Sequence, residues 1–129
     1  MATQSRFFAF LDRLKFINRW SFMRNIIPEN VIEHSWGCAT IAHMLAVIER
    51  ELYDNDVNPT EVATAALYHD AAEFIGDTPT PAKYHSKTIL HALKKIENEA
   101  ERKLLSLLPE KLQSPFSHVS ILKHVAPSI

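Results

Sequence analysis

The sequence has few of the residues that mark a turn-rich or disulfide-bonded protein. Only two glycines occur in 129 residues, which disfavours a fold built from many tight β-turns. The single cysteine, Cys38, has no partner for an intramolecular disulfide. Apolar residues make up 47% of the chain and charged residues 22%, a balance typical of a globular protein with a hydrophobic core. We therefore expect a helical, globular protein.

The sequence also lacks an excess of either charge. Lys and Arg number 14 and Asp and Glu number 15, so the formal net charge is -1. A chain without a polybasic cluster favours neither nucleic acid nor an anionic membrane as a partner. The N-terminal stretch MATQSRFFAFLDRLKF holds no uninterrupted apolar run of the kind found in signal peptides and membrane spans. We predict no nucleic-acid partner, no membrane partner and a cytoplasmic location.

Length and pattern together predict one domain that covers residues 1–129. This is an ordinary domain size, and the chain contains no internal repeat, low-complexity tract or linker. Apolar residues recur at the spacing of an α-helix in four segments. These segments are residues 4–17, residues 31–53, residues 59–76 and residues 86–108. The predicted fold class is therefore all-α.

Two of these helices carry further local signals. Asn58 is predicted to cap the third helix, with Pro59 at its first position and Glu61 at its third. Gly37 interrupts the apolar period of the second helix near its start. The fourth helix is predicted to bury one apolar face and to expose a charged one. The apolar face comprises Ile89, Leu93, Ile96, Leu104 and Leu108, and the charged face comprises Lys94, Lys95, Glu97, Glu99, Glu101, Arg102 and Lys103.

A cluster of polar residues interrupts the third apolar pattern, in the stretch ALYHDAAEFIGDTPTPAKY. His69 and Asp70 are adjacent, so on a helix they diverge by about 100° and can both reach a cation at the helix edge. Imidazole nitrogen and carboxylate oxygen together favour Mn, Fe, Co, Ni, Cu or Zn over Mg and Ca. His34, at the start of the second helix, is the histidine best placed to supply a third ligand. The pattern predicts one divalent transition metal.

Each of these residues also has a purely structural interpretation. A His-Asp pair occurs by chance in many chains, and His34 by itself is more often a core or capping histidine. Glu73 lies one helical turn after His69 and can hold a water or a leaving group near the metal, but it can equally be a solvated helix residue. Asp77 follows Gly76 and can be a simple turn residue.

Three stretches carry a resemblance to a known family. FFAFLDRLKFINRW, ENVIEHSWGCATIAHMLA and ALYHDAAEFIGDTPTPAKY resemble successive blocks of the bacterial 5'-deoxynucleotidases of the HD-domain phosphohydrolase superfamily. The resemblance runs from Phe7 to about Pro115. It implies a bundle of α-helices around one divalent metal. The implied activity is the removal of phosphate from deoxynucleoside 5'-monophosphates.

The resemblance also implies roles for individual residues. The metal ligands fall on His34, His69 and Asp70. The catalytic acidic residue falls on Glu73, and the turn aspartate near the reacting phosphate falls on Asp77. Either of these two carboxylates can orient the attacking water or protonate the departing 5' oxygen, and the sequence leaves both assignments open.

The remaining implied roles concern the substrate. Arg19 matches the residue that pairs with the phosphate, and its guanidinium can bind two phosphate oxygens at once. Trp20 matches the aromatic residue that crowds the sugar and favours the 2'-deoxy form. Asp77 is expected near the same phosphate.

One feature departs from the family pattern. The family completes its metal site with an aspartate on a later helix, but none of the five aspartates of this sequence lies beyond Asp77. We expect an HD-type bundle that is shortened at its C-terminal end, with Glu73 or water in the fourth position in preference to His118 or His124. Two functions remain open, a phosphohydrolase of reduced activity and a non-catalytic domain that binds metal or nucleotide. Uncovered apolar helix faces favour a homodimer, or the folding back of residues 116–129.

Overall fold

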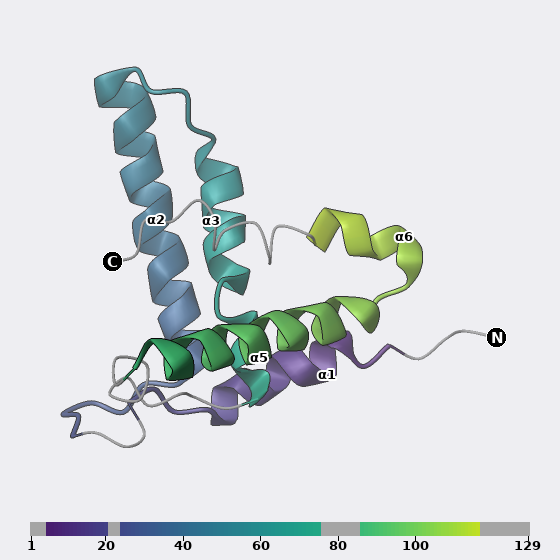
Figure 1. Ribbon diagram of the computed structural model, residues 1–129. Coiled ribbons are helices and arrows are strands. Elements are labelled where there is room, and N and C mark those ends of the chain that lie inside the picture. The colour runs from purple at the N-terminus through teal and green to yellow at the C-terminus, as the bar shows by residue number, and fades with distance from the viewer. Residues whose placement is uncertain (1–4, 21–23, 76–85, 117–129) are drawn as a thin grey trace.

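The computed structural model describes residues 5–20, 24–75 and 86–116, and within these ranges the chain is mainly helical (Figure 1). The only β pairing in the described ranges is an isolated antiparallel bridge between Asn18 and Asn30. The all-α prediction is confirmed. The α-helices are α1 (Phe7–Asp12), α2 (Val31–Tyr53), α3 (Pro59–Tyr68), α5 (Lys87–Ser106) and α6 (Glu110–Gln113), and the 3-10 helices are η1 (Arg13–Phe16), η2 (Ala71–Ile75) and η3 (Ser114–Phe116).

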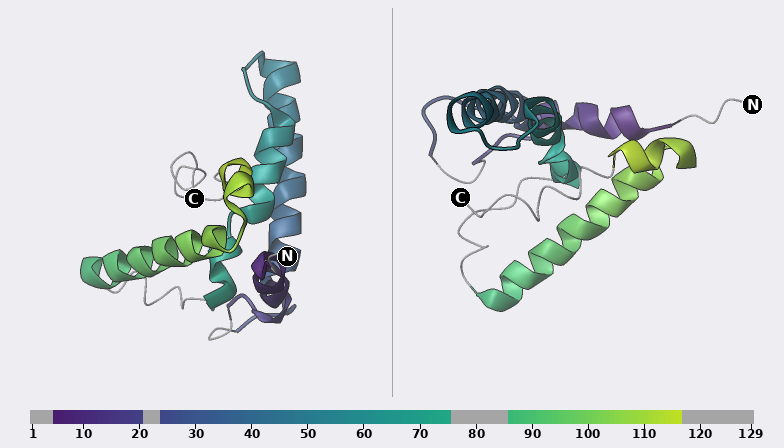
Figure 2. Two further views of the ribbon diagram at one scale, coloured as in Figure 1. Left: turned by 90° about the vertical axis from the view of Figure 1, so that its right-hand side faces the viewer. Right: turned by 90° about the horizontal axis from the view of Figure 1, so that it is seen from above.

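Helices α2 and α3 form an antiparallel pair that stands upright in Figure 1, with α5 and α1 lying across its lower end. The second view of Figure 2 shows that α5 lies to one side of this pair and is steeply inclined to α1. The α2–α3 hairpin is therefore roughly perpendicular to α1 and α5, which lie at its lower end. Helix η2 lies at the junction, where it contacts α1, η1 and α5.

The hydrophobic core lies at this junction. Phe7 of α1 and Leu104 of α5 are completely buried. Ala71, Ala72 and Phe74 of η2 pack into the same cluster. Because three of its five residues are buried, η2 is held firmly against the base, and it fixes the end of the segment that contains His69 and Asp70.

Capping residues define the starts of α2 and α3. The side chain of Asn30 accepts a hydrogen bond from the Glu33 backbone N–H, and Glu33 accepts one in return from the Asn30 N–H. This capping box satisfies two donors at the N-terminus of α2. Asn58 accepts from the backbone N–H groups of Thr60 and Glu61, which confirms its predicted role as the cap of α3.

The predicted third helix is wrong in its second half. Helix α3 ends at Tyr68, and His69 and Asp70 form a turn before η2. The backbone N–H of His69 donates to Ala66 at 3.4 Å, and that of Glu73 donates to Asp70 at 3.0 Å, so both bonds span three residues instead of four. The tighter turn carries Ala71 into the core. The predicted end at Gly76 lies outside the described residues.

The other predicted helices agree with the structure to within a few residues. The first prediction, residues 4–17, corresponds to α1 followed by η1. Helix α2 has its predicted bounds and runs through Gly37 without a break.

The burial predicted for α5 was partly wrong. Ile89 and Ile96 are exposed, because among the described residues only the C-terminal half of α5 rests on the core. Glu101, assigned to the charged face, is 4% exposed.

Helix α2 carries many apolar side chains that the described residues leave uncovered. Ile41, Met44, Leu45 and Leu52 are all more than half exposed. By length and composition α2 is also long and apolar enough to cross a membrane. This property is weak evidence for a span, because the core helices of soluble proteins share it.

Candidate metal centre

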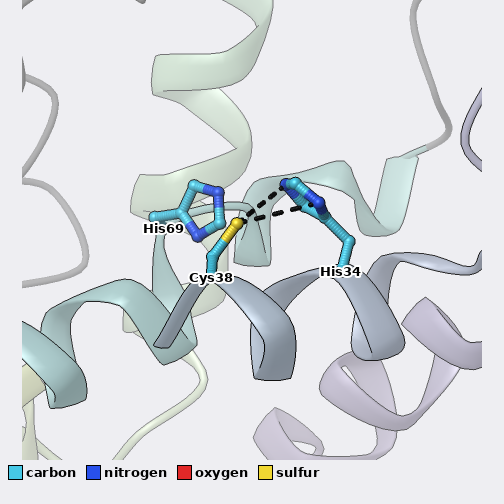
Figure 3. A group of neighbouring side chains, drawn as sticks. All are labelled: His34, Cys38 and His69. Atoms are coloured by element: carbon cyan, nitrogen blue, oxygen red, sulfur yellow. Dashed lines mark hydrogen bonds between the residues drawn. The ribbon is translucent and has the colours of Figure 1, made fainter. Parts of the chain in front are cut away.

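The first turns of α2 and the turn after α3 bring the three predicted metal ligands together. His34 Nε2 lies 3.4 Å from Asp70 Oδ2, and His69 Nε2 lies 3.0 Å from the same oxygen. The two imidazole rings are 5.4 Å apart between centroids. Figure 3 shows His34 rising from α2 and facing His69. Both ring nitrogens therefore face the same carboxylate oxygen.

The spacing of these three atoms suits a transition metal. Two ligands at about 2.0–2.2 Å from a common ion are ~3.0 Å apart at a right angle and ~3.4 Å apart at a tetrahedral angle. The observed separations of 3.0 and 3.4 Å fall on these values. Nitrogen and oxygen donors are compatible with both right-angle and tetrahedral arrangements. Such a donor set suits a borderline transition metal better than Mg or Ca.

The outer nitrogen of each histidine is engaged by another group. His69 Nδ1 donates to the Ala66 carbonyl at 2.6 Å, so Nε2 is the atom presented to the centre. His34 Nδ1 lies 3.2 Å from Glu29 Oε1. Outer partners of this kind fix the tautomer and ring orientation of metal-binding histidines. Sequence reasoning missed Glu29, whose only local signal is its position directly before the capping residue Asn30.

The surroundings of the two histidines shift their pKa values in opposite directions. Burial and the nearby Arg19 charge lower the pKa of His34 below 6.5. Burial alone would also lower the pKa of His69, but the hydrogen bond and charge of Asp70 outweigh it and raise that pKa above 6.5. Burial would raise the pKa of Asp70, yet the hydrogen bond to His69 and the neighbouring positive charges hold it below 3.8. Below the raised pKa of His69, the protonated imidazole and the Asp70 carboxylate form an ion pair.

Cys38 is a second residue that sequence reasoning missed. Its sulfur lies 3.4 Å from His34 Nε2 and 3.7 Å from Nδ1. Donor atoms of His34, Cys38 and His69 all lie within 4.8 Å of one another, and Figure 3 shows the sulfur between the two rings. Burial raises the pKa of the thiol. The signal was readable, because Cys38 follows His34 by four residues and so shares its helix face.

Arg19 lies beside this centre, and Trp20 is its neighbour in the chain. The Arg19 backbone N–H donates to the Glu29 carbonyl at 2.8 Å, and Arg19 Nη1 donates to Glu29 Oε1 at 3.5 Å. The guanidinium lies 5.7 Å from the centre of the Trp20 ring. Trp20 is 41% exposed and has a φ of 58°, a left-handed conformation that bulky residues rarely adopt. The guanidinium therefore lies over the face of the indole.

Of the two predicted carboxylates, Glu73 lies within the described residues and Asp77 does not. Glu73 belongs to η2, and one of its oxygens is shielded from solvent. Its charge helps to raise the pKa of His69, so it acts within electrostatic reach of the centre. Asp77 lies outside the described residues, as do His118 and His124.

Comparison with known proteins supports one family. A model of the YfbR-like 5'-deoxynucleotidase family matches residues 6–128. A 5'-deoxynucleotidase of Cronobacter sakazakii is 51% identical over 116 residues, which is 89% of this chain and 58% of the relative. One from Pasteurella multocida is 54% identical over 114 residues, 88% of this chain and 58% of the relative. The chain thus spans less than two thirds of the length of these curated relatives.

The fold comparison agrees with the sequence comparison. The crystal structure of an HD-domain phosphohydrolase from Listeria innocua superimposes with a TM-score of 0.76 at 29% identity. The match covers 88% of this chain and 55% of that one. The helical arrangement is therefore that of an HD domain, and the chain belongs to the YfbR-like 5'-deoxynucleotidase family.

Proposed function

We propose that this chain is a metal-dependent phosphomonoester hydrolase, with one HD-type domain over residues 1–129, that removes phosphate from deoxynucleoside 5'-monophosphates. The observation that carries the proposal is that His34 Nε2 and His69 Nε2 both lie within 3.4 Å of Asp70 Oδ2. The relatives named 5'-deoxynucleotidases supply the substrate class.

The proposed cofactor is one divalent transition metal, Co, Mn, Cu, Zn, Ni or Fe, held by His34, His69 and Asp70. A divalent cation in such a site supplies Lewis acidity to a phosphoryl oxygen. Glu29 holds the His34 ring in place from the far side, and the Ala66 carbonyl does the same for His69. The ligand rings therefore need little rearrangement before a cation enters.

The remaining residues act on the substrate. Arg19, which shares Glu29 with His34, binds two phosphate oxygens through its planar guanidinium. Glu73 holds the attacking water and accepts its proton, and Asp77 stands near the phosphate and the departing 5' oxygen. The Trp20 indole lies against the sugar and leaves no room or partner for a 2'-hydroxyl. Such exclusion is worth about 1–3 kcal/mol.

The proposal extends to assembly and location. The exposed apolar side chains of α2 provide a face on which a second copy of the chain can pack. We expect a cytoplasmic homodimer.

The test is phosphate release from a panel of deoxy and ribo monophosphates by the metal-loaded chain. The wild type should release phosphate from the deoxy forms. His69→Ala should lose both metal and activity. The control His43→Ala, which removes an exposed histidine of α2, should lose neither. Glu73→Ala should keep its metal and lose turnover, and Trp20→Ala should narrow the gap between deoxy and ribo substrates.

The opposite results have distinct meanings. A metal-loaded wild type that releases no phosphate from any substrate would overturn the enzymatic proposal and favour a non-catalytic HD domain. Full turnover by Glu73→Ala would move the proton-transfer role to Asp77.

A further inference from the structure

The cysteine beside the proposed metal centre contacts one of the proposed metal ligands directly. Cys38 lies one helical turn after His34, and its side chain rises from the same side of α2 into the space between the two histidine rings (Figure 3). Its sulfur is 3.4 Å from His34 Nε2, the atom that also faces Asp70. The sulfur therefore lies beside the same imidazole nitrogen that faces Asp70.

The distance between the Cys38 sulfur and His34 Nε2 agrees with coordination of both atoms to a common ion. With bonds of about 2.3 Å to sulfur and about 2.0–2.1 Å to nitrogen, the two donor atoms are ~3.1 Å apart at a right angle and ~3.6 Å apart at a tetrahedral angle. The observed 3.4 Å lies between these limits. His69 contributes a donor atom within 4.8 Å of both.

We propose that Cys38 is a fourth protein ligand of the metal centre and that its sulfur selects a thiophilic cation, Zn²⁺, Co²⁺ or Fe²⁺, over Mn²⁺. The inference rests on the proposed metal site and adds to it the class of metal. As sulfur binds the cation, the thiol releases its proton to the buffer, and the S–H bond is replaced by a sulfur–metal bond. Soft thiolate donors favour Zn and Fe, whereas Mn prefers carboxylate and water.

The spacing of the ligands on α2 supports this assignment. Residues four apart on a helix lie one above the other on the same face, so a single turn of α2 supplies both an imidazole and a thiolate. Asp70 and His69 supply the opposite side from the turn after α3. The four donors thus come from two rigid segments that pack against each other.

The experiment uses the full chain loaded with Co²⁺, whose bond to a thiolate gives a charge-transfer absorption in the near ultraviolet. The wild type should bind one Co²⁺ and show this absorption, and Cys38→Ser should lack it. Cys38→Asp, which keeps a ligand but not the sulfur, should bind Co²⁺ without the band. Thr40→Ala, an exposed substitution on the same helix, serves as the matched control and should retain it.

Metal competition gives a second readout that does not depend on activity. Loss of an outer-shell partner lowers metal affinity by about 10–100-fold, and Cys38→Ser should lower Zn²⁺ affinity by at least this factor. Its Mn²⁺ affinity should change far less.

Two results would overturn the inference. A wild type that binds one Co²⁺ without the band, with Zn²⁺ affinity equal to that of Cys38→Ser, would remove Cys38 from the centre and leave the proposed site intact. A chain that binds no Co²⁺ in any variant would overturn the site itself.

Discussion

At the scale of single residues, Glu29 connects the two halves of the site. Its Oε1 atom lies 3.2 Å from His34 Nδ1 and 3.5 Å from Arg19 Nη1. One carboxylate oxygen therefore orients both a proposed metal ligand and the proposed phosphate-binding group. The positive charge of Arg19 lowers the pKa of His34, and the negative charge of Glu29 acts in the opposite direction.

Removal of this carboxylate should weaken metal binding. We expect Glu29→Ala to lower metal affinity by about 10–100-fold, because the His34 ring loses its outer partner. The measurement is a titration of the metal against a competing chelator. Glu51→Ala, on the exposed surface of α2, is the control. Equal affinities for Glu29→Ala and wild type would show that the backbone alone positions His34.

The His69–Asp70 pair should make the stability of the metal-free chain depend on pH. The raised pKa of His69 contributes stability that is complete below 6.5 and is lost as the pH rises through its folded-state pKa. The lowered pKa of Asp70 contributes stability that is present above 3.8 and is lost as the pH falls through its folded-state pKa. Both contributions are present together between these two values.

This window can be measured with Asp70→Asn, which removes the pair. In the presence of chelator, the free energy of unfolding of the wild type should exceed that of Asp70→Asn. The difference should be largest near pH 5, where both contributions are present. The difference should shrink in alkaline buffer, where His69 is neutral. A difference that grew on going to alkaline pH would contradict the ion pair.

At the scale of helices, the capping box at the start of α2 holds the site in place. Asn30 caps the helix, and it also lies in the bridge with Asn18 that brings Arg19 alongside Glu29. His34 is in the first turn that this cap defines. Fraying of that turn would displace a proposed ligand directly.

A pair of cap substitutions separates helix stability from site geometry. Asn30→Ala and Asn58→Ala should each destabilise the chain by about 0.5–2 kcal/mol. Only Asn30→Ala should also lower metal affinity, because Asn58 caps α3 at the end far from His69. Thermal unfolding followed by circular dichroism gives the first quantity, and metal titration gives the second. Metal affinity that falls equally in both variants would indicate a general loss of stability.

Sequence reasoning succeeded where the signals were local. The bounds of α2, the start of α5 and the cap at Asn58 depend on residues close together in the chain. The end of α3 was missed because the apolar period continues past Tyr68. The turn there depends on the bond from His69 to Ala66 and on the burial of η2 against α1 and α5. Neither appears in a helical pattern.

The site was predictable in part for the same reason. The adjacency of His69 and Asp70 and the position of His34 led to the three residues that converge, although their roles stay predictions. Glu29 was not predictable, because its approach to His34 depends on how the segment before α2 folds. The exposure of Ile89 and Ile96 was also missed, since periodicity identifies a core-facing side but not whether a neighbour covers it.

At the scale of the whole molecule, the upright α2–α3 pair presents an apolar face that other described residues do not cover. Met44 and Leu45 lie near the middle of this face. Burial of apolar surface contributes about 25 cal/mol per Å², so a few hundred Å² buried in a dimer would contribute several kcal/mol before the cost of association. This face is the proposed interface between two copies.

The dimer can be tested by substitution within this face. Wild-type chain should have the mass of a dimer in light scattering, and Met44→Lys combined with Leu45→Lys should have the mass of a monomer. Thr64→Lys adds a charge to an exposed polar position on α3 and should leave the dimer intact. A monomeric wild type would remove the homodimer from the account.

The metal content of the purified chain tests the central claim most directly. After dialysis against buffer with excess divalent metal and then without it, elemental analysis should find one transition-metal ion per wild-type chain. Asp70→Ala removes the oxygen shared by His34 and His69 and should retain almost none, while Asp56→Ala, in the loop between α2 and α3, should retain one. Equal metal in wild type and Asp70→Ala would contradict the proposed centre.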